Sequence, residues 1–353
     1  MNSKERALDH KCPNCGGKIV FTPESGKWHC EHCKSDFDLE TLQKYNNASS
    51  EENNKSDESA NVDISYVEYH CKNCGAKIVA DEQTASTFCV YCGNTAILKS
   101  KLSGKFAPSK IIPFSKSKDE ALEAFRSLNK GRPLMPKLFN KKENIEKISG
   151  VYIPFWLYTI KTNGTLEGNC KKISTWVSGE YSYTKTDVYD VQREVDMVFK
   201  RVPVDGSTRF DNDIMNTIEP YDYSKLVNYN HAYLSGFLAE KYDVESSTAE
   251  VEAKDRTLNS TKNTLNSSLA TYSIKTIRNE NISQEISEVE YVLLPVWMVN
   301  VKYNGQFYTF AMNAQTGEFV GNIPVDRVKA IMFYAAIFIL VAALVTFIAY
   351  LAY

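Results

Sequence analysis

The apolar side chains of this chain change their spacing several times along its length. A helix is predicted just after residue 117, because Ser117 and Glu120 form a capping-box pair and an apolar stripe at helical spacing follows. The stripe consists of Ala121, Leu122, Ala124, Phe125 and Leu128. Strands are predicted from Val151 to Val204, where apolar and polar side chains alternate for much of the stretch 181–199, and again from about Glu288 to Val320.

Helical spacing returns between these two strand regions. One such segment runs from about Tyr223 to Tyr242, and a second from Thr248 to Leu269. The second segment carries many Ser, Thr and Asn residues and few large apolar ones, so an exposed and weakly packed helix is predicted there.

The chain ends in an uninterrupted apolar segment, 330–353, with no charged, Asn, Gln, Gly or Pro residue. At about 1.5 Å per residue it is roughly 36 Å long, enough to cross a bilayer. A buried helix of a soluble core is the alternative, but such a helix is rarely apolar on all sides. Arg327 and Lys329 flank its beginning, so the positive-inside rule predicts a single-pass tail anchor in the cell membrane, with the N-terminal domains cytoplasmic.

The 353 residues include nine cysteines, and the net charge is −2, which gives no indication of a polyanionic partner at whole-chain level. The N-terminus has no apolar signal-peptide segment, so the thiols are expected in a reducing compartment, where paired CxxC motifs favour metal sites. Eight cysteines form two sets with the same spacing, CxxC, fourteen residues, CxxC: Cys12, Cys15, Cys30, Cys33 and Cys71, Cys74, Cys89, Cys92.

Four thiolates suit a tetrahedral zinc ion, and the spacers are long enough for a short hairpin between the two knuckles. In the first set, a strand, a turn at Pro23 to Gly26 and a return strand are predicted. We therefore expect two structural Zn²⁺ ions, with iron as the rival metal and a redox CxxC as the alternative reading. Four neighbouring histidines are expected outside the ligand sets, and Cys170 is expected to be half-buried. These histidines are His10, His29, His32 and His70.

The predicted fold class is α+β: two small β zinc ribbons, a two-half α+β central domain with β-hairpin repeats, and one C-terminal transmembrane helix. The repeat rests on residues 151–164 and 292–305, which share P-x-W-x6-N-G. Each is predicted to be a strand that enters a hairpin turn at Asn-Gly, with Trp156 and Trp297 packed in equivalent core positions. The domains are ribbon 1 (11–38), a flexible linker (46–62), ribbon 2 (69–98), the central domain (105–325, with halves 105–211 and 219–322) and the membrane helix (330–353).

Catalytic motifs are missing from the sequence: it contains no phosphate loop, GxGxxG, HExxH or GxSxG. We therefore predict no enzymatic activity and no catalytic residues. A pocket that gathers polar side chains from both hairpin repeats would favour an enzyme instead.

Several segments resemble a known family. They are CPNCGG, CKNCGA, PSKIIPFSKSKDEALEAF, GVYIPFWLY, YNHAYLSGFLAEKYDV and LLPVWMVNVKYNGQFYTFAMNAQTGEFVGNIPVD. They are similar to bacterial membrane-anchored zinc-ribbon proteins of the transcription-factor-IIB-type ribbon family, over most of the chain from Lys11 onward. That resemblance implies no established enzymatic activity. It implies an association with flotillin-like and phage-shock-type membrane-stress proteins.

These observations predict a membrane-anchored cytoplasmic adaptor or scaffold that recruits membrane or membrane-associated proteins to the lipid bilayer. The alternative is a membrane-tethered nucleic-acid-binding protein that acts through its ribbons. A basic face is expected of such ribbons. Residues 1–44 carry seven basic and seven acidic side chains, and 63–110 carry six and four.

Overall fold

A computed structural model describes residues 12–51, 66–71, 75, 77–81, 97–101, 108–128, 132–136, 148–208, 212–303, 306–321, 323 and 325–352. The protein is mixed α+β, and its two long central strands are β8 (Ile148–Ser178) and β12 (Ile274–Tyr303). The shorter elements at the N-terminal end are β1 (Ile19–Thr22), β2 (Lys27–Cys30), β3 (Asp36–Phe37), α1 (Leu39–Glu51), β4 (Tyr66–Cys71), β5 (Lys77–Asp81), β6 (Ile97–Lys101), β7 (Lys110–Ile111) and α2 (Lys118–Leu128). The remaining elements are β9 (Tyr181–Asp205), α4 (Asn212–Ile218), the 3₁₀ turns η2 (Tyr223–Lys225) and η3 (His231–Leu234), β10 (Val227–Asn228), β11 (Leu238–Glu240), α5 (Ser246–Ser267), β13 (Gln306–Asn313), β14 (Phe319–Gly321) and α6 (Arg327–Ala352).

Strands β8 and β12 pair antiparallel over most of their length, from Ile148 opposite Val299 to Lys171 opposite Ile274. The upper part of this ladder is the part formed by the first half of β8 and the second half of β12. There β11 pairs in parallel with β8, β7 pairs in parallel with β12, and β13 forms an antiparallel hairpin with β12. The upper part is apolar on both faces, because it is covered on both sides by other elements. It forms the centre of the core.

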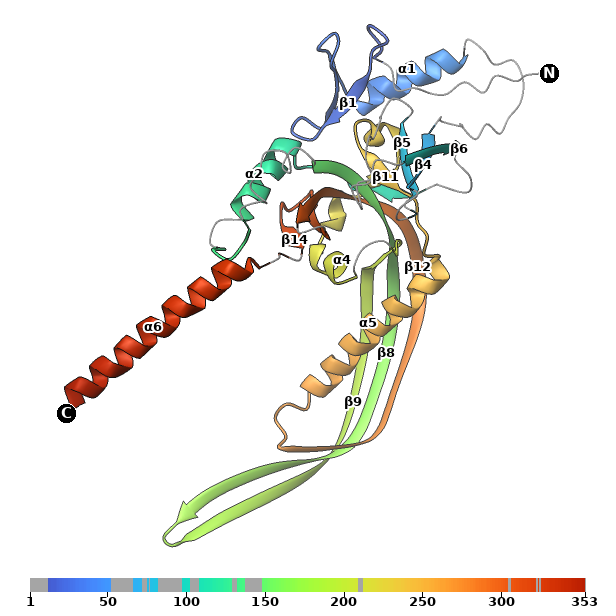
Figure 1. Ribbon diagram of the computed structural model, residues 1–353. Helices are drawn as coiled ribbons and strands as arrows, with labels where there is room; N and C mark the ends of the chain where they lie inside the picture. Colours follow the sequence, from blue (N-terminus) through green and yellow to red (C-terminus); the bar gives the residue numbers. More distant parts are fainter. Residues whose placement is uncertain are drawn as a thin grey trace.

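Below this core, β8, β12 and β9 continue as a long three-stranded arm, with α5 lying along it (Figure 1). Only one stripe of α5 is buried, at intervals of four residues: Ala249, Ala253, Thr257, Thr261 and Leu265. Small side chains let the helix lie close to the strands. The Gln284 amide donates a 2.6 Å hydrogen bond to the hydroxyl of Thr257. The helix predicted from Thr248 to Leu269 is thus present, but the prediction that it packs weakly was wrong.

The capping-box prediction is confirmed at α2. The Ser117 N–H donates to the Glu120 carboxylate at 2.8 Å, and the Glu120 N–H donates to the Ser117 hydroxyl at 3.3 Å. Ala121 and Phe125, on the predicted stripe, are fully buried. The predicted strand regions are confirmed as well, by β8 and β9 in the first and by β12, β13 and β14 in the second.

The prediction of two equivalent Asn-Gly hairpin turns was half wrong. In the second repeat, Tyr303 pairs with Gln306, so β12 and β13 form an antiparallel hairpin, while Asn304 and Gly305 themselves lie outside the described residues. In the first repeat, β8 runs straight through Asn163 and Gly164. A Cβ on Gly164 would lie 3.2 Å from side-chain atoms of Thr261 and Leu265, so this glycine serves the close approach of α5 instead of a turn.

The helix predicted from Tyr223 to Tyr242 was also wrong. This segment consists of η2, β10, η3 and β11. Asn230 caps η3 through a hydrogen bond from the Ala232 N–H, and Gly236 at φ +89° redirects the chain into β11. The apolar residues of η3 and β11 are buried in the core, where β11 lies between β8 and β5, whereas Val227 of β10 is exposed.

The first hairpin has the predicted form, with β1 and β2 joined by a turn that ends at Gly26 (φ +65°). The predicted flexible linker, 46–62, begins instead as the last part of helix α1, which runs to Glu51. Asp38 accepts a hydrogen bond from the Thr41 N–H at the start of this helix, and buried Leu42 holds it in place. Residues 52–62 lie outside the described residues.

The apolar C-terminal segment forms α6, which extends from the body with its side chains exposed (Figure 1). Asp326 caps this helix by accepting hydrogen bonds from the N–H groups of Val328 and Lys329 at 3.1 and 3.2 Å. The helix is long and apolar enough to cross a membrane, and none of its most apolar stretch is buried in the protein.

Replacement of Gly168 by alanine should damage the arm. The added Cβ would lie 2.5 Å from the Thr276 carbonyl oxygen, beside a register shift between Ile277 and Asn279. We expect a loss of about 1–3 kcal/mol of stability in the arm, seen as faster amide hydrogen exchange in the lower halves of β8 and β12. Asn169→Ala, at the exposed next position, is the control. Equal exchange in both variants would contradict the prediction.

Candidate metal centre

The structure brings the first predicted set of ligands together. The sulfur atoms of Cys12, Cys15, Cys30 and Cys33 all lie within 4.8 Å of one another. Cys12 and Cys33 are 3.4 Å apart at Sγ, and Cys15 and Cys30 are 3.6 Å apart. A tetrahedral zinc ion with 2.3 Å bonds needs sulfurs about 3.8 Å apart. The four residues therefore fit a metal ion such as zinc.

Each CxxC pair sits on a tight backbone turn. In the first, the Gly16 N–H donates to the Cys12 carbonyl at 2.8 Å, and Gly16 has φ +71°. In the second, the Lys34 N–H donates to the Cys30 carbonyl at 2.9 Å, and Lys34 has φ +60°. These positive φ angles at equivalent positions turn both sulfurs of each pair toward the same point.

Burial and hydrogen bonds shift the pKa values of the Cys12, Cys15 and Cys33 thiols in different directions. Hydrogen bonds from the hydroxyl and N–H of Ser35 lower the pKa of Cys33 to about 6. A hydrogen bond from the Gly17 N–H favours the Cys15 thiolate, but burial and the neighbouring thiols outweigh it and raise the pKa of Cys15 to about 12. Burial likewise raises the pKa of Cys12. Four thiolates this close need a cation, so metal binding must release protons from the cluster.

The neighbouring histidines differ in their surroundings. His29 Nδ1 lies 2.8 Å from a carboxylate oxygen of Asp36, within the same small sheet, so His29 already has a partner. The Cβ of His32 packs beside Gly17. His70 is half-buried at the end of β4, and His10 lies outside the described residues.

The second predicted set falls mostly outside the described residues. Cys71 is buried at the end of β4, whereas Cys74, Cys89 and Cys92 belong to the part of the chain that the structure does not describe. In this predicted ribbon, β4 pairs with both β5 and β6, and β5 pairs with β11 of the central sheet. Cys170, which we expected to be half-buried, is fully buried under α5 beside Leu166 and Leu269.

The first cysteine unit packs against the central domain through its hairpin. Trp28 is only 1% exposed, and its indole N–H donates a 2.8 Å hydrogen bond to the Ala232 carbonyl. The rings of Trp28 and Phe21 lie 5.2 and 5.4 Å from that of Tyr233. Each such aromatic pair contributes about 0.5–1.5 kcal/mol beyond the burial of its surface. The metal centre is therefore coupled to the position of η3.

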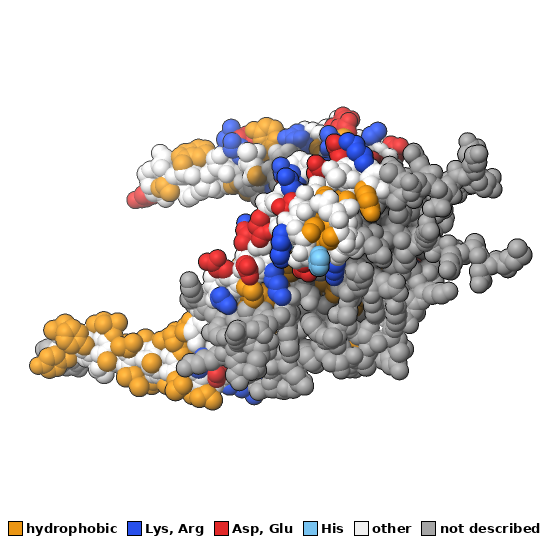
Figure 2. All heavy atoms as spheres, turned by 90° about the horizontal axis from the view of Figure 1, so that it is seen from above, with side chains coloured by type: hydrophobic (Ala, Val, Ile, Leu, Met, Phe, Trp, Pro, Cys, Tyr) orange, Lys and Arg blue, Asp and Glu red, His pale blue; other side chains and the backbone are white. Residues whose placement is uncertain are grey.

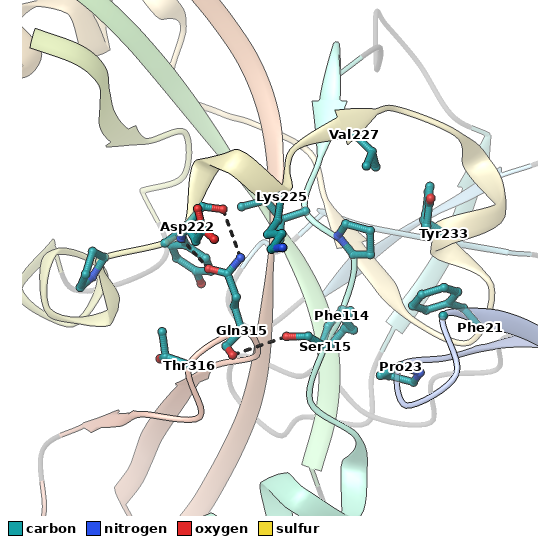
Figure 3. A pocket seen from close by; sticks show the side chains of 15 residues that line it. Phe21, Pro23, Phe114, Ser115, Asp222, Lys225, Val227, Tyr233, Gln315 and Thr316 are labelled. Carbon is teal, nitrogen blue, oxygen red and sulfur yellow. Dashed lines mark hydrogen bonds between the residues drawn. The ribbon is translucent and has the colours of Figure 1, made fainter.

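A pocket of about 820 Å³ opens beside this contact (Figure 3). Phe21 and Pro23 of the hairpin form one wall, and Phe114 forms part of another. The opposite rim is held by two hydrogen bonds between the Gln315 side chain and the backbone of Asp222, at 2.6 and 3.2 Å. The other lining residues are Gly26, Ile112, Pro113, Ser115, Pro220, Tyr221, Lys225, Val227, Tyr233 and Thr316.

The sequence interpretation did not identify this pocket, because its walls come from four distant parts of the chain. Three of them belong to segments that carry the family resemblance: IIPFS (111–115), NHAYL (230–234) and NAQT (313–316). The family motifs therefore pointed to these segments, but the sequence did not show that the segments meet around one pocket. The pocket is mainly apolar and draws on neither hairpin repeat.

The fold and the cysteine cluster define a mixed α+β protein with a site for a metal ion and one apolar C-terminal helix. The chain is 36% identical over 330 residues to "Uncharacterized protein YdjG" of Bacillus subtilis, and the match covers 94% of each protein. The chain belongs to the family of YdjG. No family model matches it, so the transcription-factor-IIB-type ribbon remains a resemblance. No solved structure matches it either.

Removal of the metal should expose Trp28. Because the hairpin that carries Trp28 has little core of its own, a strong chelator should shift the tryptophan emission to longer wavelength. A fall in pH should have the same effect, since protons compete with the metal for the thiolates. Cys15→Ser, which changes an exposed ligand, should lose one metal equivalent and show the shifted emission without chelator.

Elemental analysis of the purified protein gives the number of metal ions per chain and also distinguishes zinc from iron. The control is Cys170→Ala, which leaves both predicted sets unchanged and should retain the wild-type metal content. Wild-type protein without zinc or iron would contradict the assignment of the metal centre.

Proposed function

We propose that this protein is a membrane-anchored, cytoplasmic zinc-ribbon adaptor that recruits membrane or membrane-associated partners, of the kind found in membrane-stress systems. One observation carries the proposal. The metal-binding unit packs beside a mainly apolar pocket, and the same chain ends in an exposed apolar helix. Such a combination supports binding and positioning at a bilayer more than chemical catalysis.

In this proposal the metal is zinc and its role is structural. Four cysteines close the coordination sphere, which leaves no open position for a substrate. The second set, Cys71, Cys74, Cys89 and Cys92, holds a second zinc ion in the same way. The first ion stabilises the hairpin that forms one wall of the pocket, so it acts on partner binding through that wall.

The anchor is α6, with its beginning at the cytoplasmic face. Arg327 and Lys329 lie at that end, and the Lys329 ammonium also donates a 2.7 Å hydrogen bond to the Met135 carbonyl. The Asp326 N–H donates to the Leu134 carbonyl at 2.9 Å. The first turn of the helix is thus attached to the segment after α2, which supports a fixed position of the body close to the membrane.

The pocket is the proposed binding site for a partner segment. Phe21, Phe114 and Tyr233 offer aromatic surface, and Lys225 provides a positive charge at the rim. Aromatic walls with a few polar groups suit a short apolar peptide segment that carries an acidic group. The family motifs that converge here support a role shared with relatives.

Deletion of residues 330–353 should release the protein from membranes. Wild-type protein should remain in the membrane pellet after alkaline carbonate washing, because about 24 apolar residues are buried in lipid. The truncated protein should appear in the soluble fraction with its metal content unchanged. Wild-type protein that is soluble after cell disruption would contradict the anchor.

Val227→Asp should reduce partner recovery from gently solubilised membranes. Val227 lines the pocket and is partly exposed, so the carboxylate should disturb binding more than folding. The matched control is Val251→Asp, on the outer face of α5 and away from the pocket. Recovery of the same proteins from both variants would exclude the pocket as the partner site. If wild-type protein enriches no other protein, the adaptor proposal itself fails.

A further inference from the structure

The end of the β8–β9 hairpin extends beyond the rest of the sheet. Pairing of β8 with β12 stops at Lys171, whereas its pairing with β9 continues to Ser178 opposite Tyr181. Beyond Lys171 the edge of β8 is free of β12, and the side chains of residues 171–186 are exposed on both faces of the two strands (Figure 1). A two-stranded hairpin alone has little core to hold it together.

This uncovered end is unusually apolar. Val177 is 73% exposed, Tyr181 is 70% exposed and Trp176 is 48% exposed. The indole of Trp176 stacks on the ring of Tyr183 across the two strands, with centroids 5.7 Å apart. The exposed large apolar residues near this end are Ile173, Trp176, Val177, Tyr181, Tyr183, Val188 and Tyr189. Apolar side chains gathered on a protruding element indicate a contact surface.

The apolar side chains point to both faces of the hairpin. Residues alternate between the faces of a strand, so Trp176 and its partner Tyr183 lie on one face, while Ile173 and Val177 lie on the other. A protein docked on one face would leave the other apolar face in water. Immersion of the whole hairpin end in lipid would bury the apolar side chains of both faces.

The hairpin end and α6 project toward the same side of the body in two views at right angles, and Figure 2 shows them at opposite edges of that side (Figures 1 and 2). Between Ile173 and Tyr183, Glu180 at the turn is the single charged residue. Trp and Tyr are the residues enriched at the membrane–water interface, where the ring is in apolar surroundings and its polar atom is hydrated. One charged residue at the turn allows shallow insertion, whereas Lys172 and Lys185 limit its depth to the headgroup region.

We propose that residues 173–183 form a second membrane contact, in which the end of the β8–β9 hairpin inserts into the interface of the bilayer that α6 crosses. This inference rests on the proposed anchoring by α6. The tether holds the hairpin near the bilayer at high effective concentration, so a small apolar surface is sufficient for stable insertion. The ligand is the lipid interface itself, and the small charge of the hairpin end means that anionic lipid is not required.

Tryptophan fluorescence tests this contact in the full chain. The protein has four tryptophans, none of them in α6, and Trp28 and Trp297 are buried while Trp156 is half-buried. Quenching by lipids brominated on their acyl chains therefore reports mainly on Trp176. The full chain is reconstituted into phosphatidylcholine vesicles with and without brominated lipid, and flotation first establishes that it is bound.

Brominated lipid should quench part of the wild-type emission, and Trp176→Phe should abolish that quenched part. Val177→Asp should reduce the quenching, while Val198→Asp, an exposed position within the three-stranded arm, should leave it unchanged. Floating protein in which Trp176 is quenched by aqueous iodide and not by lipid would overturn the proposal. Protection of Trp176 from both quenchers would also overturn it, in favour of a protein partner or a second copy. Protein that does not float would instead refute the anchoring by α6 on which the inference rests.

Discussion

The antiparallel ladder between β8 and β12 is the interaction on which the other elements depend. Its partners are more than a hundred residues apart, from Ile148 with Val299 to Lys171 with Ile274, so the chain must close a long loop before any of this pairing forms. Once formed, the ladder offers edges for β7, β9 and β11 and a face for α5. The first five residues of the two repeated stretches, 151–155 and 292–296, pair with each other in this ladder. Their likeness thus corresponds to two strands that share one environment at the centre of the core.

Local signals in the sequence predicted local structure well. The capping box of α2, the turn between β1 and β2 and the apolar helix α6 depend on neighbouring residues, and each is where the sequence placed it. The failures came from tertiary contacts. Asn163-Gly164 has the sequence of a turn, but α5 needs the space that Gly164 leaves. The spacing of the first two CxxC pairs correctly predicted that their four sulfur atoms lie together. Two tight turns and one short hairpin are enough to bring these sulfurs to one point. The pocket could not be predicted, since the contacts between its four wall segments arise only through the sheet.

The first cysteine unit packs against the central domain as part of one folded body. It is therefore not a ribbon that moves freely on a flexible linker. Its hairpin shares Phe21 and Trp28 with the aromatic contacts around Tyr233. The N–H of Phe21 also donates a 3.1 Å hydrogen bond to the Ser235 carbonyl. A metal ion that holds the cysteine knuckles in place therefore also fixes one wall of the pocket. In the proposed function, partner binding at this wall and metal binding are linked, and each changes the affinity for the other by the same free energy.

The remaining surface of the arm shows that the apolar hairpin end is a local departure from its surroundings. Strand β9 is an edge strand, and its outward positions along the arm are mostly polar or charged, as at Asp190, Glu194, Asp196 and Lys200. Charged side chains on exposed edges discourage pairing with other chains. Asp190 also pairs with Arg278 across the arm. The arm is thus protected by charged side chains, whereas its tip exposes Trp176, Val177 and Tyr181. This contrast fits a tip that lies in the lipid interface and an arm that lies in water. A second contact there would stop the body from rotating about α6, and so would fix which way the pocket faces along the membrane.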